Sequence, residues 1–379
     1  MNRALITAVF FMLTNYAFAH SSSNSFISVN QENSTMTVRI DLPLRDMDLR
    51  FDFDRNLDGA ITWQEIKQEK PSVMRWVAEG ITWSSELGVC QLGQANWAAA
   101  QYSEEYYLSI EAALNCQEAS APKQLKVRYQ LFFDQDALHR GLIRAVVGKS
   151  SLSGVFSPDR PEMVLDPQKS GFFWVVTTYL IEGVWHIWIG ADHILFLLSL
   201  LLPCVFLGRN PGTHSADQVG HWRPVQTLRP ALINVLAVVT AFTVAHSITL
   251  GLTVFEIINP PGNLIEPIIA ASVVIAALGN LTKRLIHLRW QIAFGFGLIH
   301  GFGFASVLTD LGLPSDQLTA SLLGFNLGVE LGQLAIVSAF FPIAWKLRAT
   351  ALYRWGFVVT GSIVIAAIAT YWLVQRIAL

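Results

Sequence analysis

The stretch HIWIGADH, residues 186–193, decides the interpretation of the chain, because it puts two histidines and an aspartate at the start of a long apolar run. An ionisable side chain is costly inside a bilayer, so it normally faces a bundle interior or a cavity and marks a site or a pathway. Imidazoles combined with carboxylates are also ligands that divalent transition metals favour. The sequence therefore predicts a membrane protein that handles metal ions. The residues of this kind within apolar runs are His186, Asp192, His193, His246, Glu266, His300 and Glu330.

The spacing of these residues supports a shared site. In a helix, His186 and His193 lie seven residues apart and therefore on one face, with Asp192 next to that face. A carboxylate beside an imidazole can bind the metal directly or fix the tautomer of the ring. Asn326 joins Glu330 in a polar stripe on a later apolar run. The alternative is that each group only makes a hydrogen bond between helices.

Charge divides the chain into two unlike halves. Residues 20–171 carry 20 acidic and 15 basic side chains, which suits a water-exposed domain, whereas residues 172–379 carry only 8 and 10. No basic tract indicates a nucleic-acid partner. We therefore predict an exported domain followed by an all-α membrane bundle that contacts the lipid bilayer.

Apolar runs long enough to cross a bilayer occur six times in the second half. Lysine and arginine gather in the first, third and fifth loops between them, as positive-inside bias requires when the N-terminus is exported. Residues 172–186 are also apolar and fit an interfacial or re-entrant helix, or else a seventh span. The six predicted spans are 187–207, 229–256, 264–282, 290–311, 319–345 and 355–375.

The N-terminus predicts export. Residues 1–19 hold Arg3, a short apolar run and an Ala-Phe-Ala ending, which is the pattern of a secretory signal peptide. Cleavage would leave His20 first, where its amine and imidazole can chelate a metal such as copper; the alternative is an unconstrained terminal residue. In an oxidising compartment, Cys90 and Cys116 are expected to form a disulfide. These features predict a protein of the bacterial inner membrane with its N-terminal domain in the periplasm.

The exported domain, residues 20–150, is predicted to be small and either β-rich or α+β. Segments 24–44 and 106–148 alternate apolar and polar residues as strands do, and residues 61–81 between them have a helical pattern. Residues 151–171 contain the glycines and prolines that are typical of a linker.

One motif in this domain is specific. Residues 54–65, DRNLDGAITWQE, carry oxygen side chains at loop positions 1, 3 and 5, glycine at 6 and glutamate at 12, which is the pattern of an EF-hand calcium loop. The residues before it, 46–53, look more like a strand than an entering helix. An acidic turn with coincidental spacing is the alternative. The predicted Ca²⁺ ligands are Asp54, Asn56, Asp58, Ala60, Thr62 and Glu65.

Several segments of the membrane half resemble the HupE/UreJ family of membrane proteins. The hallmark of that family is a His-Pro-x-x-Gly-x-Asp-His segment in the first membrane helix. Residues 186–193 match it, except that Ile187 stands in place of the proline. Three further segments are similar to later helices of the family: AHS at 245–247, HGFG at 300–303 and FNLGVE at 325–330.

This resemblance covers roughly residues 172–379 and is closest to a subgroup with a large exported N-terminal domain. It implies uptake of nickel or cobalt for metalloenzymes. By the same resemblance, His186, Asp192 and His193 are the residues that recognise the metal.

Three functions remain open at the level of the sequence. The leading one is a permease for nickel or cobalt, with zinc or copper as alternatives. It would be a secondary permease, because the chain has no nucleotide-binding or phosphorylated-aspartate motif. The second is an intramembrane zinc hydrolase in which three histidines and an aspartate activate water. The third is a metal sensor or assembly factor whose exported domain binds a periplasmic protein.

Overall fold

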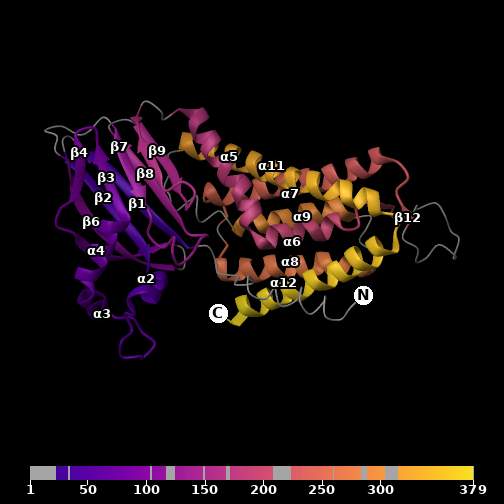
Figure 1. The fold of residues 1–379 in the computed structure, drawn as a ribbon, viewed down its shortest axis with the longest axis horizontal. Helices are drawn as coiled ribbons and strands as arrows, with labels where there is room; N and C mark the ends of the chain where they lie inside the picture. The colour runs from indigo at the N-terminus through magenta and orange to yellow at the C-terminus, as the bar shows by residue number, and fades with distance from the viewer. Residues whose placement is uncertain are drawn as a thin grey trace. The chain divides into compact units, whose positions relative to one another are not determined.

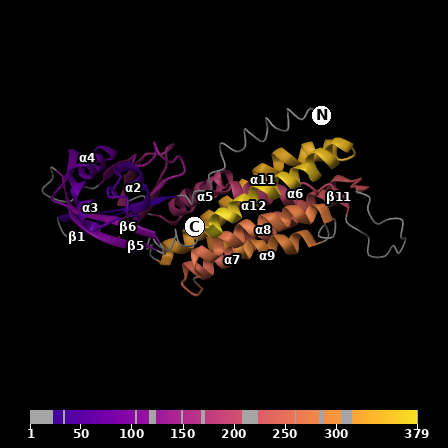
Figure 2. The same cartoon turned by 90° about the horizontal axis from the view of Figure 1, so that it is seen from below.

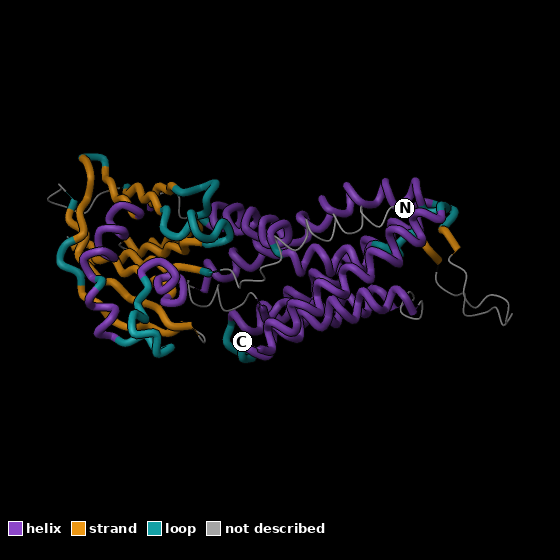
Figure 3. The backbone as a smooth tube through the Cα atoms, turned by 60° about the horizontal axis from the view of Figure 1, so that its bottom comes forward, coloured by secondary structure: helices purple, strands orange, loops and turns teal. Residues whose placement is uncertain are grey.

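The computed structural model consists of two compact units, and each is described by itself. Strands dominate the first unit and helices make up most of the second (Figure 3), so a membrane helical domain is preceded by a β-rich domain, as predicted. The predicted signal peptide, residues 1–19, and His20 lie outside the described residues. The structure describes residues 23–32, 35–102, 105–116, 124–147, 150–167, 171–207, 223–258, 260–282, 288–303 and 315–378.

The first unit is built on a ten-stranded sheet with the order β10-β7-β3-β4-β6-β2-β1-β8-β9, in which β5 also pairs with β6 (Figure 1). β1 and β8 run parallel, and the other pairs are antiparallel. The strands are β1 (Asn24–Glu32), β2 (Thr35–Pro43), β3 (Ile81–Ser85), β4 (Gly88–Leu92), β5 (Asn96–Tyr102), β6 (Glu105–Asn115), β7 (Leu125–Tyr129), β8 (Arg140–Val147), β9 (Ser150–Phe156) and β10 (Glu162–Leu165).

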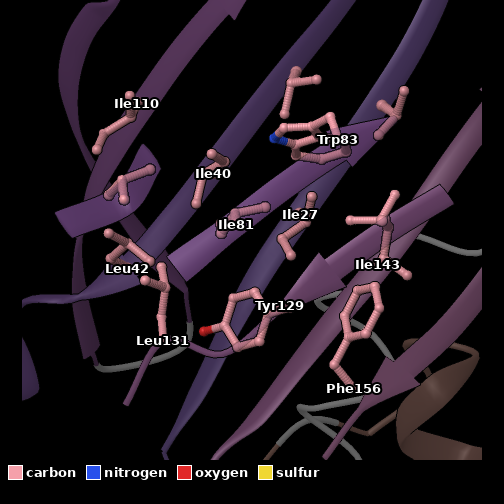
Figure 4. Packing of buried hydrophobic residues seen from close by; sticks show 14 of the residues in the cluster. Ile27, Ile40, Leu42, Ile81, Trp83, Ile110, Tyr129, Leu131, Ile143 and Phe156 are labelled. Carbon is pink, nitrogen blue, oxygen red and sulfur yellow. The ribbon is translucent and has the colours of Figure 1, made fainter. Parts of the chain in front are cut away.

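Alternate residues of the central strands form the core of this unit. Ile27 on β1, Ile40 on β2 and Ile143 on β8 are almost fully buried, and Trp83 and Tyr129 pack among them (Figure 4). Successive side chains of a strand point to opposite faces, so one face of each strand supplies the core. Burying one such side chain contributes about 1.5–3 kcal/mol.

The predicted boundary of the domain at residue 150 is wrong. β9 and β10 lie within the predicted linker, residues 151–171, and complete the sheet. Gly154, which we counted as a linker residue, is a buried strand residue opposite Ile143. The last five residues of β9 are all buried, and a strand covered on both faces loses the alternation that identifies strands in a sequence.

Three helices join β2 to β3: α2 (Leu44–Phe51), α3 (Trp63–Gln68) and α4 (Lys70–Gly80). The helical pattern predicted for residues 61–81 is confirmed by α3 and α4. The strand predicted before the EF-hand-like loop is wrong, because that segment belongs to α2. Leu44, Met47 and Phe51 pack on the core at helical spacing. Leu49, which a strand would place on the same face as Met47 and Phe51, is 75% exposed.

A buried histidine makes hydrogen bonds to side chains at the start of β1. His139 is fully buried, and its Nδ1 lies 2.5 Å from Ser23 Oγ. Its Nε2 lies 2.8 Å from the hydroxyl of Tyr129 and 3.2 Å from Ser25 Oγ. Burial, with the nearby charge of Arg140, lowers the pKa of His139 from 6.5 to about 3. The ring is therefore neutral in the folded domain.

The predicted disulfide is present. Cys90 in β4 and Cys116 just after β6 form it, next to the pair that Gln91 and Asn115 make between these strands. Closing a loop of this size stabilises a domain by about 3 kcal/mol, mainly by restricting the unfolded chain. The bond is consistent with an exported domain.

The second unit contains helices with a high apolar content. Five segments of the described chain are long and apolar enough to cross a bilayer: α5, α7, α8, α11, and η4 continued by α12. Two short strands, β11 (Phe206–Leu207) and β12 (Arg223–Pro224), pair with each other. The helices are α5 (Phe172–Ile189), α6 (Ala191–Leu201), α7 (Leu228–Val254), α8 (Gly262–Thr282), α9 (Arg289–Gly303), α11 (Ser315–Leu347), the π-helix η4 (Leu352–Thr360) and α12 (Gly361–Ala378).

Four of the six predicted spans coincide with α7, α8, α11 and η4–α12. The span predicted at 290–311 begins as α9, and its residues 304–311 lie outside the described part of the chain. The span predicted at 187–207 is wrong, because the backbone of Gly190 is extended (φ −66°, ψ 94°) and separates α5 from α6. Residues 172–186, predicted as an interfacial helix or an additional span, belong to α5, which has the length and composition of a span.

Glycine lets α9 approach α7, and the two helices run side by side in Figures 1 and 2. A Cβ on Gly301 would overlap the carbonyl oxygen of His246, and a Cβ on Gly297 would lie 2.6 Å from the carbonyl oxygen of Phe242. Small residues permit this close packing of membrane helices. The close approach brings His300 of α9 towards His246 of α7.

Candidate metal centre

Three imidazoles from different helices converge in the second unit. His186 lies near the end of α5, His193 in the first turn of α6 and His246 in α7. One ligand nitrogen from each lies within 4.8 Å of the other two, so a single ion can reach all three. We call these three residues the histidine centre. Among the described residues, no other group of three or more metal-binding side chains converges in this way.

The break at Gly190 creates the first half of the centre. Seven residues of an unbroken helix would separate the two rings by about 10 Å along its axis. The ring centroids of His186 and His193 instead lie 4.5 Å apart. A Cβ at Gly190 would come within 2.7 Å of the His186 carbonyl oxygen and 2.8 Å of His193 Nδ1. Glycine is therefore required where the backbone turns beside the ring.

Hydrogen bonds at two of the three rings leave one nitrogen of each available to a metal. His193 Nδ1 lies 2.9 Å from Asp192 Oδ1, and His246 Nδ1 lies 3.2 Å from Asn326 Oδ1. Both partners are acceptors, so each Nδ1 carries the proton and each Nε2 keeps its lone pair. Neither Nε2 has a hydrogen-bond partner within the described chain. An unsatisfied buried nitrogen costs about 1–3 kcal/mol, which a bound ion would offset.

A fourth imidazole lies beside the centre. The ring centroid of His300 is 5.2 Å from that of His193. Ser272 Oγ donates to the carbonyl oxygen of Ile269 at 2.7 Å and therefore accepts from His300 Nε2 at 3.0 Å. A hydroxyl has one hydrogen, so Nε2 carries the ring proton and Nδ1 is the nitrogen with the lone pair. His300 Nδ1 also has no hydrogen-bond partner among the described residues.

Aromatic side chains form an apolar wall around these rings. Phe196 and Phe242 lie with their ring centroids 5.0 and 5.4 Å from that of His300, and Phe325 lies 5.2 Å from His186. All three phenylalanines are at most 2% exposed. Excluding water in this way strengthens electrostatic and metal–ligand interactions at the centre.

Asp192 links the centre to a basic residue. Its Oδ2 lies 3.6 Å from Nη2 of Arg376 on α12, and Nε of Arg376 lies 3.8 Å from Glu266 Oε2. Glu266, predicted as a metal ligand, is half exposed and contacts Arg376. It is not one of the three residues of the histidine centre. We did not assign Arg376 to the site from the sequence. The sequence did offer one indication: Arg376 lies near the end of an apolar helix, where an arginine requires an acidic or polar partner.

The polar stripe on α11 contacts α7 at three levels. Asn326, predicted as a metal ligand, contacts the centre through His246 Nδ1. Gln333 Oε1 accepts a hydrogen bond from Thr243 Oγ1 at 3.2 Å. Glu330 Oε1 accepts from Thr240 Oγ1 at 3.0 Å. Thr240 lies six residues from His246, so Glu330 belongs to a separate contact between the helices.

Residues 166–376, more than half of the chain, match the model of the family described as HupE / UreJ protein. The chain belongs to the HupE/UreJ family. No curated protein shows significant similarity to it. Membership is consistent with a membrane protein that has a role related to metal-ion transport, and all members of the histidine centre fall within the matched residues.

The HupE/UreJ hallmark segment supplies two of the three imidazoles of the centre. Where the family segment has proline, this chain has Ile187, which is buried in α5. α5 continues through Ile187 to Ile189, and the interruption falls at Gly190. The departure from the HupE/UreJ pattern therefore leaves both histidines facing the same point.

The EF-hand-like loop lies between two helices, α2 and α3. Gly59, at loop position 6, has a φ of 80°, a conformation that favours glycine. Asp54 accepts hydrogen bonds from the amides of Asp58 and Gly59, and Asp58 accepts one from Ala60. Asn56 accepts from Asp58, and Glu65 accepts from both the amide and the hydroxyl of Thr62. The side-chain oxygens of the predicted ligands therefore make hydrogen bonds within the loop in this structure.

Proposed function

We propose that this HupE/UreJ protein is a secondary permease that carries a divalent transition-metal ion, nickel or cobalt, across the bacterial inner membrane. The observation that carries the proposal is the approach of three imidazole nitrogens to within 4.8 Å of one another in the membrane domain. Neutral imidazoles suit nickel, cobalt, zinc and copper, whereas calcium and magnesium prefer oxygen ligands. The family expectation favours nickel or cobalt within this group.

A permease also needs polar groups beyond its binding site. The bond between Thr243 and Gln333 is buried and lies about one helical turn from His246. Asn280 donates hydrogen bonds to the carbonyl oxygen of Ser199 and to Ser362 Oγ. In the proposed orientation both groups lie on the cytoplasmic side of the centre. They support passage of an ion more than the closed site of a hydrolase.

The proposed orientation follows from the distribution of basic residues in the loops. The signal peptide, residues 1–19, would export the domain of strands to the periplasm, and the C-terminus would also lie outside. Ions would enter the centre from the periplasm and leave to the cytoplasm. The chain has no nucleotide-binding motif, so an ion gradient or the membrane potential would drive transport.

Uptake into sealed proteoliposomes tests this function. Radiolabelled Ni²⁺, Co²⁺, Zn²⁺ and Cu²⁺ would be supplied in turn to the wild type, His193→Ala and His246→Ala. Loss of a ligand is expected to lower uptake of the substrate ion at least about tenfold. The matched control is Thr253→Val, an isosteric change on α7 at a buried threonine whose hydroxyl donates to the carbonyl oxygen of Thr249 in the same helix.

The possible results separate the candidate functions. Uptake of nickel or cobalt that both histidine changes abolish and the control preserves would support the proposal. Uptake restricted to zinc or copper would keep the permease and change its substrate. Stoichiometric binding of a metal without uptake of any ion would refute the permease and favour the intramembrane hydrolase or a metal sensor.

We also propose that residues 54–65 bind a structural Ca²⁺ ion in the exported domain. The proposal is supported by ligand spacing, by Gly59 at the turn and by helices on both sides of the loop. Calcium is plentiful outside the cytosol, which suits a permanently bound ion. A domain fixed in this way would offer a stable surface to a periplasmic partner.

A further inference from the structure

The guanidinium of Arg376 lies between two carboxylates from different helices. Its Nη2 is 3.6 Å from Asp192 Oδ2 of α6, and its Nε is 3.8 Å from Glu266 Oε2 of α8. Its Nη1 also donates a hydrogen bond to the carbonyl oxygen of Glu266 at 3.2 Å. One side chain of α12 therefore connects the first turn of α6 to the start of α8.

This ion pair is not an ordinary surface salt bridge. Only 16% of the Arg376 side chain and 19% of the Asp192 side chain are exposed. Removing one partner of a largely buried pair leaves an uncompensated charge, which costs far more free energy than removing a partner of a solvent-exposed pair. The charge of Arg376 therefore acts strongly on the groups that it faces.

Arg376 and the histidine centre share one carboxylate. Asp192 Oδ1 accepts from His193 Nδ1 at 2.9 Å, while Oδ2 faces the guanidinium. Without a metal ion, the carboxylates of Asp192 and Glu266 set two negative charges against the one positive charge of Arg376. A divalent ion at the centre reverses the sign of this local sum. The ion and the guanidinium therefore compete for stabilisation by the same carboxylate.

We propose that Arg376 is the built-in counter-cation of the ion-free carrier. It offsets the charge of Asp192 when the centre is empty, and its contact with Asp192 weakens when a divalent ion binds. The inference rests on the proposed permease function. It assigns Arg376 to the return of the empty carrier, because an uncompensated carboxylate at the largely buried Asp192 would make that step costly. Arg376 acts through Asp192 and is a positioning residue.

Two transport assays separate this role from a structural one. Net uptake of Ni²⁺ or Co²⁺ requires the empty carrier to return, whereas exchange of labelled for unlabelled ion across the liposome membrane does not. In Arg376→Gln, net uptake is expected to fall at least about tenfold while exchange stays within about twofold of the wild type. Affinity for Ni²⁺ in detergent is expected to rise several-fold, because the competing cation is gone. Arg376→Lys retains the charge and is expected to restore much of the net uptake.

The control is Arg229→Gln, the same change at an exposed arginine at the start of α7. Equal loss of exchange and net uptake in both Arg376 variants would show a structural role and overturn the inference. Wild-type rates of net uptake and exchange in Arg376→Gln would overturn it as well. Absence of uptake by the wild type would instead refute the permease itself, before any variant is compared.

Discussion

The ring centroids of His186 and His193 lie 4.5 Å apart across a break in the helix at Gly190. An unbroken helix would have kept the two rings about two turns apart. The interruption therefore converts two residues on one helix face into neighbours that can share an ion. The approach of His246 completes the centre.

Gly190→Ala is expected to lower affinity for Ni²⁺ or Co²⁺ about tenfold or more, because the added Cβ displaces the His193 ring. Titration calorimetry of the purified protein in detergent measures the change. Gly295→Ala is the matched control, since its Cβ meets no atom within 4 Å and the residue lies in α9. Equal affinity in the two alanine variants would show that the break does not position the ring.

Asn326→Leu is expected to weaken metal binding about 10–100-fold, the usual effect of removing the group that orients a ligating histidine. The change removes the acceptor that holds the proton on His246 Nδ1. Asn326→Asp keeps an acceptor oxygen and should retain most of the affinity. Competition with a metal-sensitive dye gives the affinities. Similar losses in both variants would contradict a role in fixing the tautomer.

The N-terminal β-rich domain is expected to lose stability as the pH falls from about 6.5 towards 3. Burial lowers the pKa of His139 to about 3, so the unfolded chain binds a proton in this range and the folded domain does not. The free energy of unfolding then falls by at most about 1.4 kcal/mol per pH unit and is unaffected by this group above pH 6.5. Hydrogen exchange of the amides of β1 and β8 in the full chain measures it. His139→Gln should be less stable at pH 7.5 and show a smaller pH dependence.

Under the calcium proposal, Ca²⁺ is expected to stabilise the N-terminal β-rich domain by about 2.7 kcal/mol at a hundredfold excess over its Kd. Glu65→Gln should abolish this gain while leaving calcium-free stability nearly unchanged. Glutamine can still cap α3 at Thr62, but it cannot provide a bidentate carboxylate. Hydrogen exchange of α3 with calcium and with a chelator gives both values. Glu79→Gln, at an exposed residue of α4, is the control. A calcium response in Glu65→Gln equal to the wild type would exclude the loop as the site.

The sequence predicted most of the membrane domain because a long apolar run has few structures open to it other than a membrane-spanning helix. The interior of α7, Leu228–Val254, satisfies its backbone groups within the helix, so a long apolar run there predicts a span by itself. The same reasoning failed at Gly190, where hydropathy continues but the helix does not. It also failed at β9, because a strand buried on both faces has the composition of many other segments.

The sequence alone determined which residues could hold a metal. His186, His193 and His246 carry imidazoles within apolar runs, which can be read directly from the sequence. Only the tertiary structure decided which of the candidates meet. It brought the three rings together, placed Glu330 on Thr240, and set Arg376 against Asp192. The physical reason is the distance along the chain over which each effect acts. Burial and helical periodicity act between residues close in sequence, whereas ligand convergence and charge pairing depend on how separate helices pack, which spacing along the chain does not encode.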